Sequence, residues 1–434
     1  MTSDRFGELM QPVGRDRIDD GTAPPVTPAS PVTRNAARQV LVAVLLNAVC
    51  VLPSFLVSSM PGAIASDLQL DPVVLGFAFS AFWLVASVAA YPMASKANIW
   101  GPVRALRVAG ILAFLLCILL ASSARSAGTL VITLGLAGCA PALATPAMNM
   151  VIMSAVPARR RASAFAVAST GPVAALMLAG IVGSAFESSI GWRCAFVLSG
   201  IAAVLHTPLV KSAAETPPTT PTPPAADHTD SNPRAPSLRP LAVMMVGVLA
   251  GNLALGAATA FMVLAAPAAG MDSDHASLAV SAGAGASIVL RLVCAALVDR
   301  RGWDPFPMCW LMMLAGAVGF GFLASSASWT YVLGLLLALG PGWSWISLLV
   351  HGVMCRYPHA VARASGIVQS AYFIGGVIGP VIMGVIIATS SYSAAWSVMV
   401  GAQVTAALFV ILAGRRLPPF AALPSAEGDR PRPD

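Results

Sequence analysis

Residues 39–210 and 241–413 are apolar almost without interruption, and this feature restricts the chain to a membrane-spanning fold. Only 10% of the 434 residues are charged and 57% are hydrophobic, whereas a soluble domain has about 25% charged residues. Too few polar side chains are present to cover a surface in water. A spanning helix needs roughly 20 residues, so the apolar stretches fit about twelve spans. The runs are long and do not alternate, which favours helices over a transmembrane barrel.

We therefore predict an all-α membrane protein, in which twelve transmembrane helices form two pseudo-symmetric six-helix bundles. The expected spans are 40–62, 73–95, 105–122, 128–154, 162–186, 193–210, 241–268, 277–298, 306–325, 329–355, 364–388 and 394–413. The expected parts are a disordered cytoplasmic N-tail at 1–38, an N-terminal bundle at 39–210, a Pro-rich cytoplasmic linker at 211–240, a C-terminal bundle at 241–413 and a cytoplasmic C-tail at 414–434.

The N-tail and the linker carry specific signals. Residues 1–38 mix five acids with five arginines, so we expect no cleavable signal peptide and expect the first span to direct insertion. Residues 211–240 hold eight prolines, which excludes a helix and predicts a flexible connector.

Basic residues between the spans are distributed unequally over the two sides of the membrane. Those on the side of the N-terminus are Lys96, Arg104, Arg107, Arg159, Arg160, Arg161, Arg300, Arg301, Arg356 and Arg363. The other side holds only Arg125 and Arg193. This bias predicts that both termini are cytoplasmic. We expect a multi-pass protein of a bacterial-type cytoplasmic (inner) membrane.

The two halves of the chain repeat each other at a nearly constant spacing. Gly101 in NIWGPVR and Gly302 in DRRGWDP are 201 residues apart. The prolines of PARRRAS and PHAVARAS, in the loops after spans 4 and 10, are also 201 residues apart. Asn47 and Asn252 occupy corresponding places in spans 1 and 7. Because each half has an even number of spans, the repeat is parallel, about an axis along the membrane normal.

These motifs resemble the major facilitator superfamily over about residues 40–413. The signature loop of that family, G-x-L-A-D-R-x-G-R-R, is matched after span 8 by AALVDRRG at 295–302. Its first copy is degraded, because Asn98 stands where the family has Asp, although Gly101 is kept. Span 5 carries STGPVAALMLAGIVG, which is similar to the Gly-Pro stretch of the family. The segments at 340–349 and 366–380 favour the cyanate/nitroimidazole-transporter-like branch, with the proton-linked drug efflux branch as the alternative.

The resemblance implies secondary active transport by alternating access and gives several residues a conformational role. The implied latch consists of Asn98, Gly101, Asp299, Arg300 and Gly302, although a plain helix end with flanking charges is the alternative. The hinge or packing residues are Gly171, Pro172, Gly375, Gly379 and Pro380.

Arg291 is the only charged residue that we place inside the membrane. It lies in span 8, eight residues before Asp299, which is about 12 Å deeper than the cytoplasmic end of the helix. No acid accompanies it in any span, and such a residue marks a substrate or ion path. The planar guanidinium suits a carboxylate, and the resemblance to monocarboxylate-type members also implies an anion. Alternatively, Arg291 holds backbone carbonyls or extends toward the cytoplasm.

Other polar and aromatic residues in the spans are candidates for substrate binding. They are Asn47, Asn149, Asn252, Trp343, Trp345, Gln369 and Tyr372. The corresponding positions of Asn47 and Asn252 favour a shared role, although such residues more often hold helices together. Trp343 and Trp345 lie near mid-span, where they can line a cavity.

We expect proton-coupled transport of a small organic anion, with proton-driven multidrug or antimicrobial efflux as the second hypothesis and uniport or exchange left open. The proton carrier is the substrate itself, Asp67, Glu187 or His351. A membrane-embedded enzyme is disfavoured because the five histidines are dispersed and no nucleophile lies beside a base. The expected partners are a small-molecule substrate and the lipid bilayer. We expect a monomer without nucleic acid, metal or cofactor, driven by the proton gradient.

Overall fold

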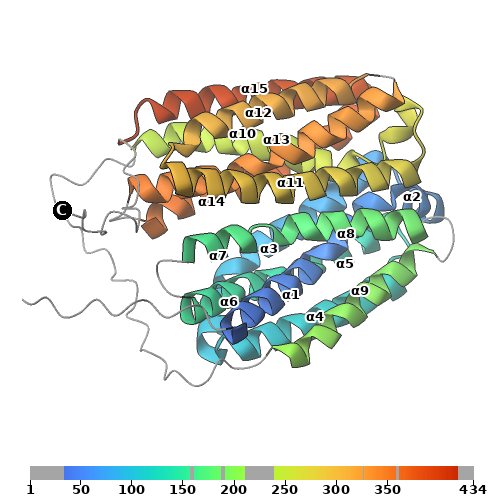
Figure 1. The fold of residues 1–434 in the computed structure, drawn as a ribbon. Helices are drawn as coiled ribbons and strands as arrows, with labels where there is room; N and C mark the ends of the chain where they lie inside the picture. The colour runs from blue at the N-terminus through green and yellow to red at the C-terminus, as the bar shows by residue number, and fades with distance from the viewer. Residues whose placement is uncertain are drawn as a thin grey trace, which may run out of the picture. The chain divides into compact units, whose positions relative to one another are not determined.

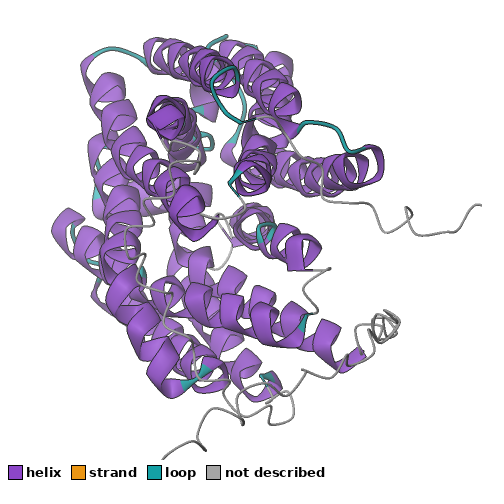
Figure 2. Cartoon of the chain, turned by 90° about the vertical axis from the view of Figure 1, so that its left-hand side faces the viewer, coloured by secondary structure: helices purple, strands orange, loops and turns teal. Residues whose placement is uncertain are grey.

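The computed structural model describes residues 34–156, 161–186, 191–210, 239–325, 327–357 and 361–418. Within these ranges the chain consists of helices joined by short turns, and no strand occurs in them (Figure 2). Nearly all of the predicted N-tail and linker, and the predicted C-tail beyond Pro418, lie outside the described residues.

The helices follow one another along the chain in two sets. The first-half helices are α1 (Arg34–Ser59), α2 (Pro61–Leu68), α3 (Pro72–Trp100), α4 (Pro102–Ser123), α5 (Ala127–Ala137), α6 (Cys139–Ala155), α7 (Arg161–Ala168), α8 (Gly171–Phe186), α9 (Trp192–His206) and the short 3-10 helix η2 (Thr207–Leu209). The second-half helices are α10 (Arg239–Phe261), the 3-10 helix η3 (Ala266–Ala269), α11 (Ser273–Arg301), α12 (Pro305–Leu323), α13 (Ser328–Arg356), α14 (Val361–Thr389) and α15 (Tyr392–Gly414).

In the described residues, twelve helical segments are long and apolar enough to cross a membrane. Two of them are interrupted: α5 and α6 form one span, and α7 and α8 form another. The predicted all-α fold with twelve spans is confirmed. Figure 1 shows α10 to α15 lying together and α1 to α9 lying together.

The helix boundaries reproduce the repeat that the sequence predicts. α3 and α11 both contain 29 residues, and they begin 201 residues apart. Both end on a glycine with positive φ, +77° at Gly101 and +62° at Gly302, where a side chain would be strained. Both start with an aspartate, Asp71 or Asp272, whose side chain accepts a hydrogen bond from the first turn. Equivalent local signals therefore produce equivalent helices in the two halves.

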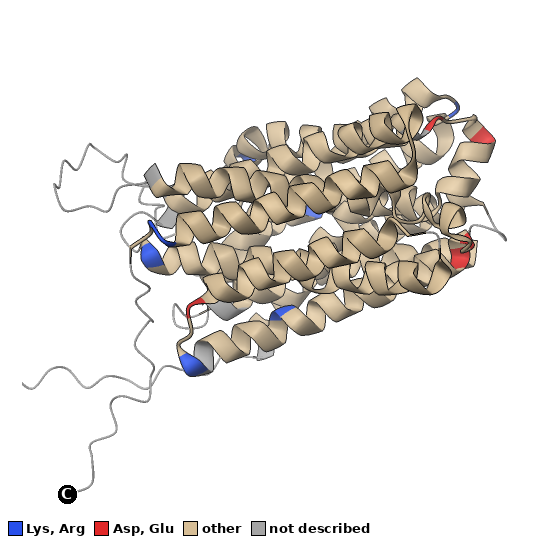
Figure 3. Ribbon diagram, turned by 90° about the horizontal axis from the view of Figure 1, so that it is seen from above, with Lys and Arg blue, Asp and Glu red and all other residues tan. Residues whose placement is uncertain are grey.

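Charged residues gather at the ends of the helices, with acids mostly at one end and bases mostly at the other (Figure 3). We call the end at which α1 begins and α15 ends the terminal end, and the end that carries α2 the opposite end (Figure 1).

Buried apolar side chains form three clusters: one contains residues of both halves, and each of the other two contains residues of one half only. Toward the opposite end, the shared cluster joins Phe55 of the first half to Phe261 and Ala284 of the second. Toward the terminal end, one cluster containing Leu106 belongs to the first half alone. Another, containing Val298, belongs to the second half alone. The halves therefore pack against each other at the opposite end and have separate cores at the terminal end.

Small residues allow the close helix contacts at the seams. A side chain at Gly375 or Gly379 would run into the backbone of Leu253 in α10, so these two glycines hold α14 against α10. Gly76 of α3 packs in the same way against the backbone of Pro380 in α14, which joins the two halves. In the structure, Gly375 and Gly379, two of the predicted hinge or packing residues of span 11, pack against α10.

Candidate functional site

Arg291 lies in α11, at the level where the shared core gives way to the separate cores. With a rise of 1.5 Å per residue, it lies about 27 Å from Ser273 and about 15 Å from Arg301. Along α11 the shared cluster extends to Ala284, and the second-half cluster resumes at Cys294. The residue is only 4% exposed, so its charge is buried between these cores.

The guanidinium of Arg291 is bonded to both halves of the chain. Its Nη2 donates to the carbonyl of Trp343 at 2.6 Å, and its Nε donates to Ser287 Oγ at 3.4 Å. Its Nη1 donates to the carbonyl of Ser169, in the first half, at 3.2 Å. The guanidinium also lies 5.7 Å from the centre of the Trp343 ring, within the range of a cation–π contact. In this conformation Arg291 therefore holds backbone carbonyls, one of the two alternatives that the sequence left open.

Three further residues extend this network through the second half. Ser344 Oγ lies 3.0 Å from Ser287 Oγ, so the hydroxyl next to Arg291 is itself hydrogen-bonded. Trp343 Nε1 donates to the hydroxyl of Tyr372 at 3.1 Å, and Asn252 Nδ2 donates to the carbonyl of Tyr372 at 2.5 Å. The structure thus brings together four of the predicted binding residues from four helices. We call the set Asn252, Ser287, Arg291, Trp343, Ser344, Tyr372 and Ser169 the polar layer.

No carboxylate compensates the charge of Arg291 in the part of the chain that the structure describes. The ion pairs found there involve other cations, namely Arg193, His275 and Arg356. The three hydrogen bonds of this guanidinium go to neutral carbonyl and hydroxyl oxygens, so no acid among the described residues balances its charge. The polar layer therefore contains a buried positive charge that no described acid balances.

In the first half, Asn47 lies at a corresponding level of α1. It is 3% exposed, and its Oδ1 accepts a hydrogen bond from Thr145 Oγ1 at 3.0 Å. The contact joins α1 to α6, as expected of a polar residue that holds helices together. Asn149 lies one turn further along α6 and is partly buried.

Two predicted residues, Trp345 and Gln369, form no hydrogen bond with this network, although the ring of Trp345 lies edge-on to that of Tyr372, with ring centres 6.4 Å apart. Trp345 is fully buried in the core of the second half, where a Cβ at Gly251 would lie 2.9 Å from its ring. Its ring therefore packs inside that half, and it does not line an open space in this conformation. Gln369 is partly buried one turn before Tyr372, and its side chain makes no hydrogen bond within the described residues.

At the terminal end, the proposed latch is only partly described. Asn98 is exposed at the last turn of α3, and Gly101 and Gly302 end their helices as above. Asp299 and Arg300 lie in α11, but their side chains are outside the described residues. The latch therefore stays a prediction.

An ion pair that the sequence analysis missed lies just beyond Gly302. Asp304 caps the start of α12: its side chain accepts a hydrogen bond from the N–H of Phe306 at 3.0 Å and lies 2.6 Å from Arg356 Nη2. Arg356 Nε also donates to the carbonyl of Pro418 at 3.0 Å. The contacts tie α12, α13 and the end of the described chain together. The available signals were an aspartate directly before a proline and an arginine in the last turn of a helix.

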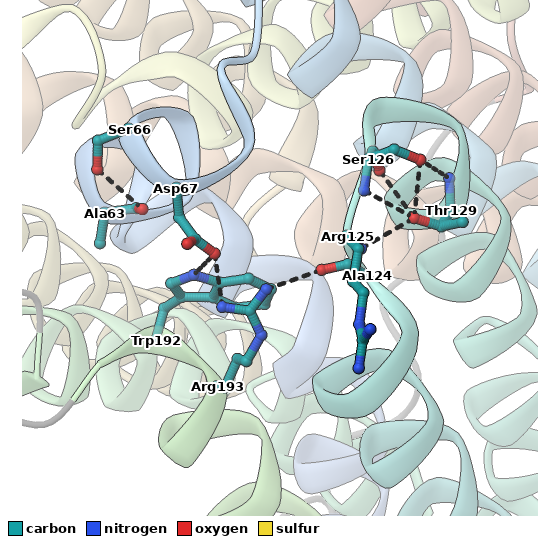
Figure 4. Close-up of polar contacts among 9 residues, drawn as sticks. All are labelled: Ala63, Ser66, Asp67, Ala124, Arg125, Ser126, Thr129, Trp192 and Arg193. Atoms are coloured by element: carbon teal, nitrogen blue, oxygen red, sulfur yellow. Dashed lines mark hydrogen bonds and ion pairs between the residues drawn. The ribbon is translucent and has the colours of Figure 1, made fainter.

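At the opposite end, Asp67 of α2 is part of a cluster with the start of α9 (Figure 4). It accepts hydrogen bonds from Arg193 Nη1 at 2.5 Å and from Trp192 Nε1 at 3.2 Å. Arg193 Nη2 in turn donates to the carbonyl of Ala124 at 2.9 Å. The hydrogen bond from Arg193 holds the pKa of Asp67 below its usual value. Asp67 is therefore poorly suited to take up a proton near neutral pH.

The other predicted proton carriers are not in the polar layer. Glu187 lies outside the described residues. His351 lies in α13, with its Nε2 3.6 Å from Cys355 Sγ, and its role stays a prediction. Within the described residues, no three His, Cys, Asp or Glu side chains come together in a way that could hold a metal ion.

Comparison with known protein families gives one match. The sequence profile described as "Major Facilitator Superfamily" matches residues 42–380, most of the chain. No curated protein sequence matches the chain.

Several solved transporter structures are similar to this one. A D-xylose-proton symporter is 16% identical with a TM-score of 0.71, over 90% of this chain and 99% of that one. A bacterial homolog of the human lysosomal transporter Spinster, inward-facing and unoccupied, is 15% identical with a TM-score of 0.67, over 88% and 98%. The nucleoside transporter NupG is 14% identical with a TM-score of 0.67, over 88% and 100%. At these identities the likeness shows the shared fold.

Proposed function

The chain belongs to the major facilitator superfamily, and from this premise we propose that it transports a small organic anion together with a proton. It is a multi-pass membrane transporter and not an enzyme. In the proposed cycle, the two halves rock about the polar layer and expose it alternately to the two sides of the membrane. The carboxylate of the substrate binds Arg291 and neutralises its charge during the crossing.

One observation carries this proposal: the guanidinium of Arg291 is buried without a carboxylate partner among the described residues. A carboxylate that replaced one of its neutral acceptors would form a charge-assisted hydrogen bond, which is about twice as strong as a neutral one. A neutral or cationic substrate would gain nothing comparable and would leave the charge unbalanced. The position of Arg291 at the end of the shared core is also where a substrate would meet both halves.

In the proposed mechanism the proton travels with the substrate. Among the described side chains, Asp67, Asp71, Asp272, Asp274 and Asp304 lie at or near helix ends and leave the polar layer without an acid. Asp67 is engaged by Arg193. An anion and a proton that cross together move no net charge through the membrane, and one structurally similar protein is a D-xylose-proton symporter.

We propose further that the terminal end faces the cytoplasm of a bacterial-type inner membrane. The excess of basic residues in the loops of that end supports this orientation. The even number of spans puts both termini on one side. No cofactor and no partner subunit is needed for such a cycle, so the proposed unit is a monomer energised by the proton gradient.

Uptake by proteoliposomes tests the substrate class and the coupling together. Purified full-length protein would be reconstituted with an imposed pH gradient, and radiolabelled acetate, lactate and benzoate would be compared with the bulky cation ethidium. We expect at least one carboxylate to accumulate and a protonophore to abolish the accumulation. Transport of ethidium without any carboxylate would overturn the anion assignment and favour multidrug efflux. Accumulation that the protonophore leaves intact would overturn the proton coupling alone.

A further inference from the structure

The three hydrogen bonds of Arg291 are of two kinds. Ser287 lies on α11 itself and Trp343 lies on α13, which packs against α11 in the second half. These two contacts move with Arg291 when the halves rock. Ser169 belongs to the first half, so the bond to its carbonyl must break when the halves part at this level. One donor of the guanidinium, Nη1, therefore changes its partner during the cycle.

The carbonyl of Ser169 is free to accept this bond because the helix is interrupted there. α7 ends at Ala168, and the N–H of Thr170 turns back to the carbonyl of Val167 at 3.0 Å. α8 begins at Gly171, and Pro172 is its second residue. Pro172 has no N–H to offer the carbonyl of Ala168, four residues earlier, and its ring would clash with that carbonyl in a regular helix, so the helix breaks between α7 and α8. The interruption leaves the Ser169 carbonyl for a partner outside the helix, and Arg291 takes it.

The corresponding helix of the second half has no such interruption. α14 runs unbroken from Val361 to Thr389, and the residue 201 positions after Pro172 is Phe373, which carries an N–H. The break is therefore a feature of the first half alone. Arg291, the buried arginine of the polar layer, comes from the second half and bonds to this break in the first half.

We propose that Pro172 is a positioning residue for Arg291, because the helix break that it causes leaves the Ser169 carbonyl outside the helix, where it holds the guanidinium across the two halves when no substrate is bound. In the empty carrier, the Ser169 carbonyl occupies the position on Arg291 Nη1 that the carboxylate of the substrate takes in the loaded carrier. The two halves can therefore come together without substrate while Nη1 keeps an acceptor. Only this last step depends on the proposed function. The positioning of Arg291 by Pro172 does not.

The distance between the halves in the substrate-free protein tests the proposal. Spin labels would be attached to Lys96→Cys at the end of α3 and Trp303→Cys beyond α11, both exposed at the terminal end. The partly or fully exposed cysteines Cys139, Cys194 and Cys355 would be replaced by serine. Pulsed electron–electron resonance then gives the distribution of distances in nanodiscs.

We expect Pro172→Ala and Arg291→Gln each to shift the distribution toward longer distances, by about tenfold in the ratio of separated to joined halves. The double variant should shift no further than either single variant, because both changes remove the same contact. Pro92→Ala, which removes a proline from the interior of α3, is the matched control and should leave the distribution unchanged.

Two results would overturn the proposal. If neither single variant changes the distribution, the contact does not hold the halves together. If the effects of Pro172→Ala and Arg291→Gln add, Pro172 acts on the helix by itself and not through Arg291. Because no substrate is present, either result leaves anion transport standing, and a protein that carries no anion could still show the coupling.

Discussion

At the scale of single residues, the polar layer works because each donor has a defined acceptor. Trp343 is the clearest case: its ring faces Arg291, its carbonyl accepts from Arg291 Nη2, and its Nε1 donates to Tyr372. In such a network, removing one partner of a hydrogen bond lowers the free energy of unfolding more than removing both partners. The reason is that a buried donor left without an acceptor costs more than the hydrogen bond itself contributes.

Tyr372→Phe is therefore expected to lower the free energy of unfolding by about 1–3 kcal/mol, because it leaves Trp343 Nε1 without its acceptor. In the double variant Trp343→Phe/Tyr372→Phe, the unpaired donor is removed as well, and we expect a large part of this loss to be recovered. Thermal unfolding in detergent measures both variants, with Trp343→Phe alone as the third corner of the cycle. A double variant whose loss equals the sum of the single losses would show that the two groups are not coupled.

Asp67 gives a prediction about pH. Its pKa is lowered in the folded protein by the hydrogen bond from Arg193, so its stabilising effect is present above the unfolded pKa, about 3.9. The effect is lost as the pH falls through the lowered folded value. We expect Asp67→Asn to reduce the melting temperature at pH 7 and to make it less dependent on pH below 5. Asp274→Asn removes the same charge near the same end without breaking an ion pair among the described residues. An equal effect of both variants would mean that net charge, and not the contact with Arg193, is responsible.

At the scale of helices, local sequence signals account for most of what the structure shows. Span limits follow from hydropathy, and the ends of α3 and α11 follow from Gly101 and Gly302. The Gly-Pro pair indicated the interruption only in part, because sequence alone does not show where the broken helix ends and which carbonyl lies in the break. Ser287, one turn earlier in α11, is a neighbour of Arg291 by helical periodicity, but its partners on other helices, Ser169 and Trp343, could not be predicted at all. They are separated from it by 122 and 52 positions, and no periodic pattern encodes contacts at such distances.

Two glycines of α14 test the packing between helices. Gly375 touches the backbone of α10, where an added Cβ would lie 2.9 Å from the nitrogen of Leu253, whereas Gly366 has open space around it. We expect Gly375→Ala to destabilise the protein by about 1–3 kcal/mol through overpacking. Gly366→Ala should be neutral or stabilising by up to about 1 kcal/mol, because alanine favours a helix more than glycine does. Melting temperatures of the two variants give the comparison, and equal values would contradict the close contact of α14 with α10.

At the scale of the whole chain, the arrangement of the cores describes one stage of a transport cycle. The halves share a core toward the opposite end and have separate cores toward the terminal end, with the polar layer at the boundary. Alternating access requires the shared core to part at the opposite end in another stage. Composition predicted twelve spans and the repeat predicted two halves. Which end is joined depends on side-chain packing between helices that are distant in sequence, and therefore only the structure shows it.

The central claim is that Arg291 binds an anionic substrate. The most direct measurement is uptake of radiolabelled carboxylates by proteoliposomes that contain the wild type, Arg291→Leu or Arg107→Leu. Arg107 is the matched control, because it also donates to a backbone carbonyl, that of Val210 at 2.9 Å, but lies in α4 and outside the polar layer. We predict that Arg291→Leu reduces carboxylate uptake at least about 100-fold, as expected for the loss of a charge-assisted contact of about 3 kcal/mol, while Arg107→Leu stays close to the wild type. Uptake by correctly folded Arg291→Leu at the rate of the wild type would contradict the account.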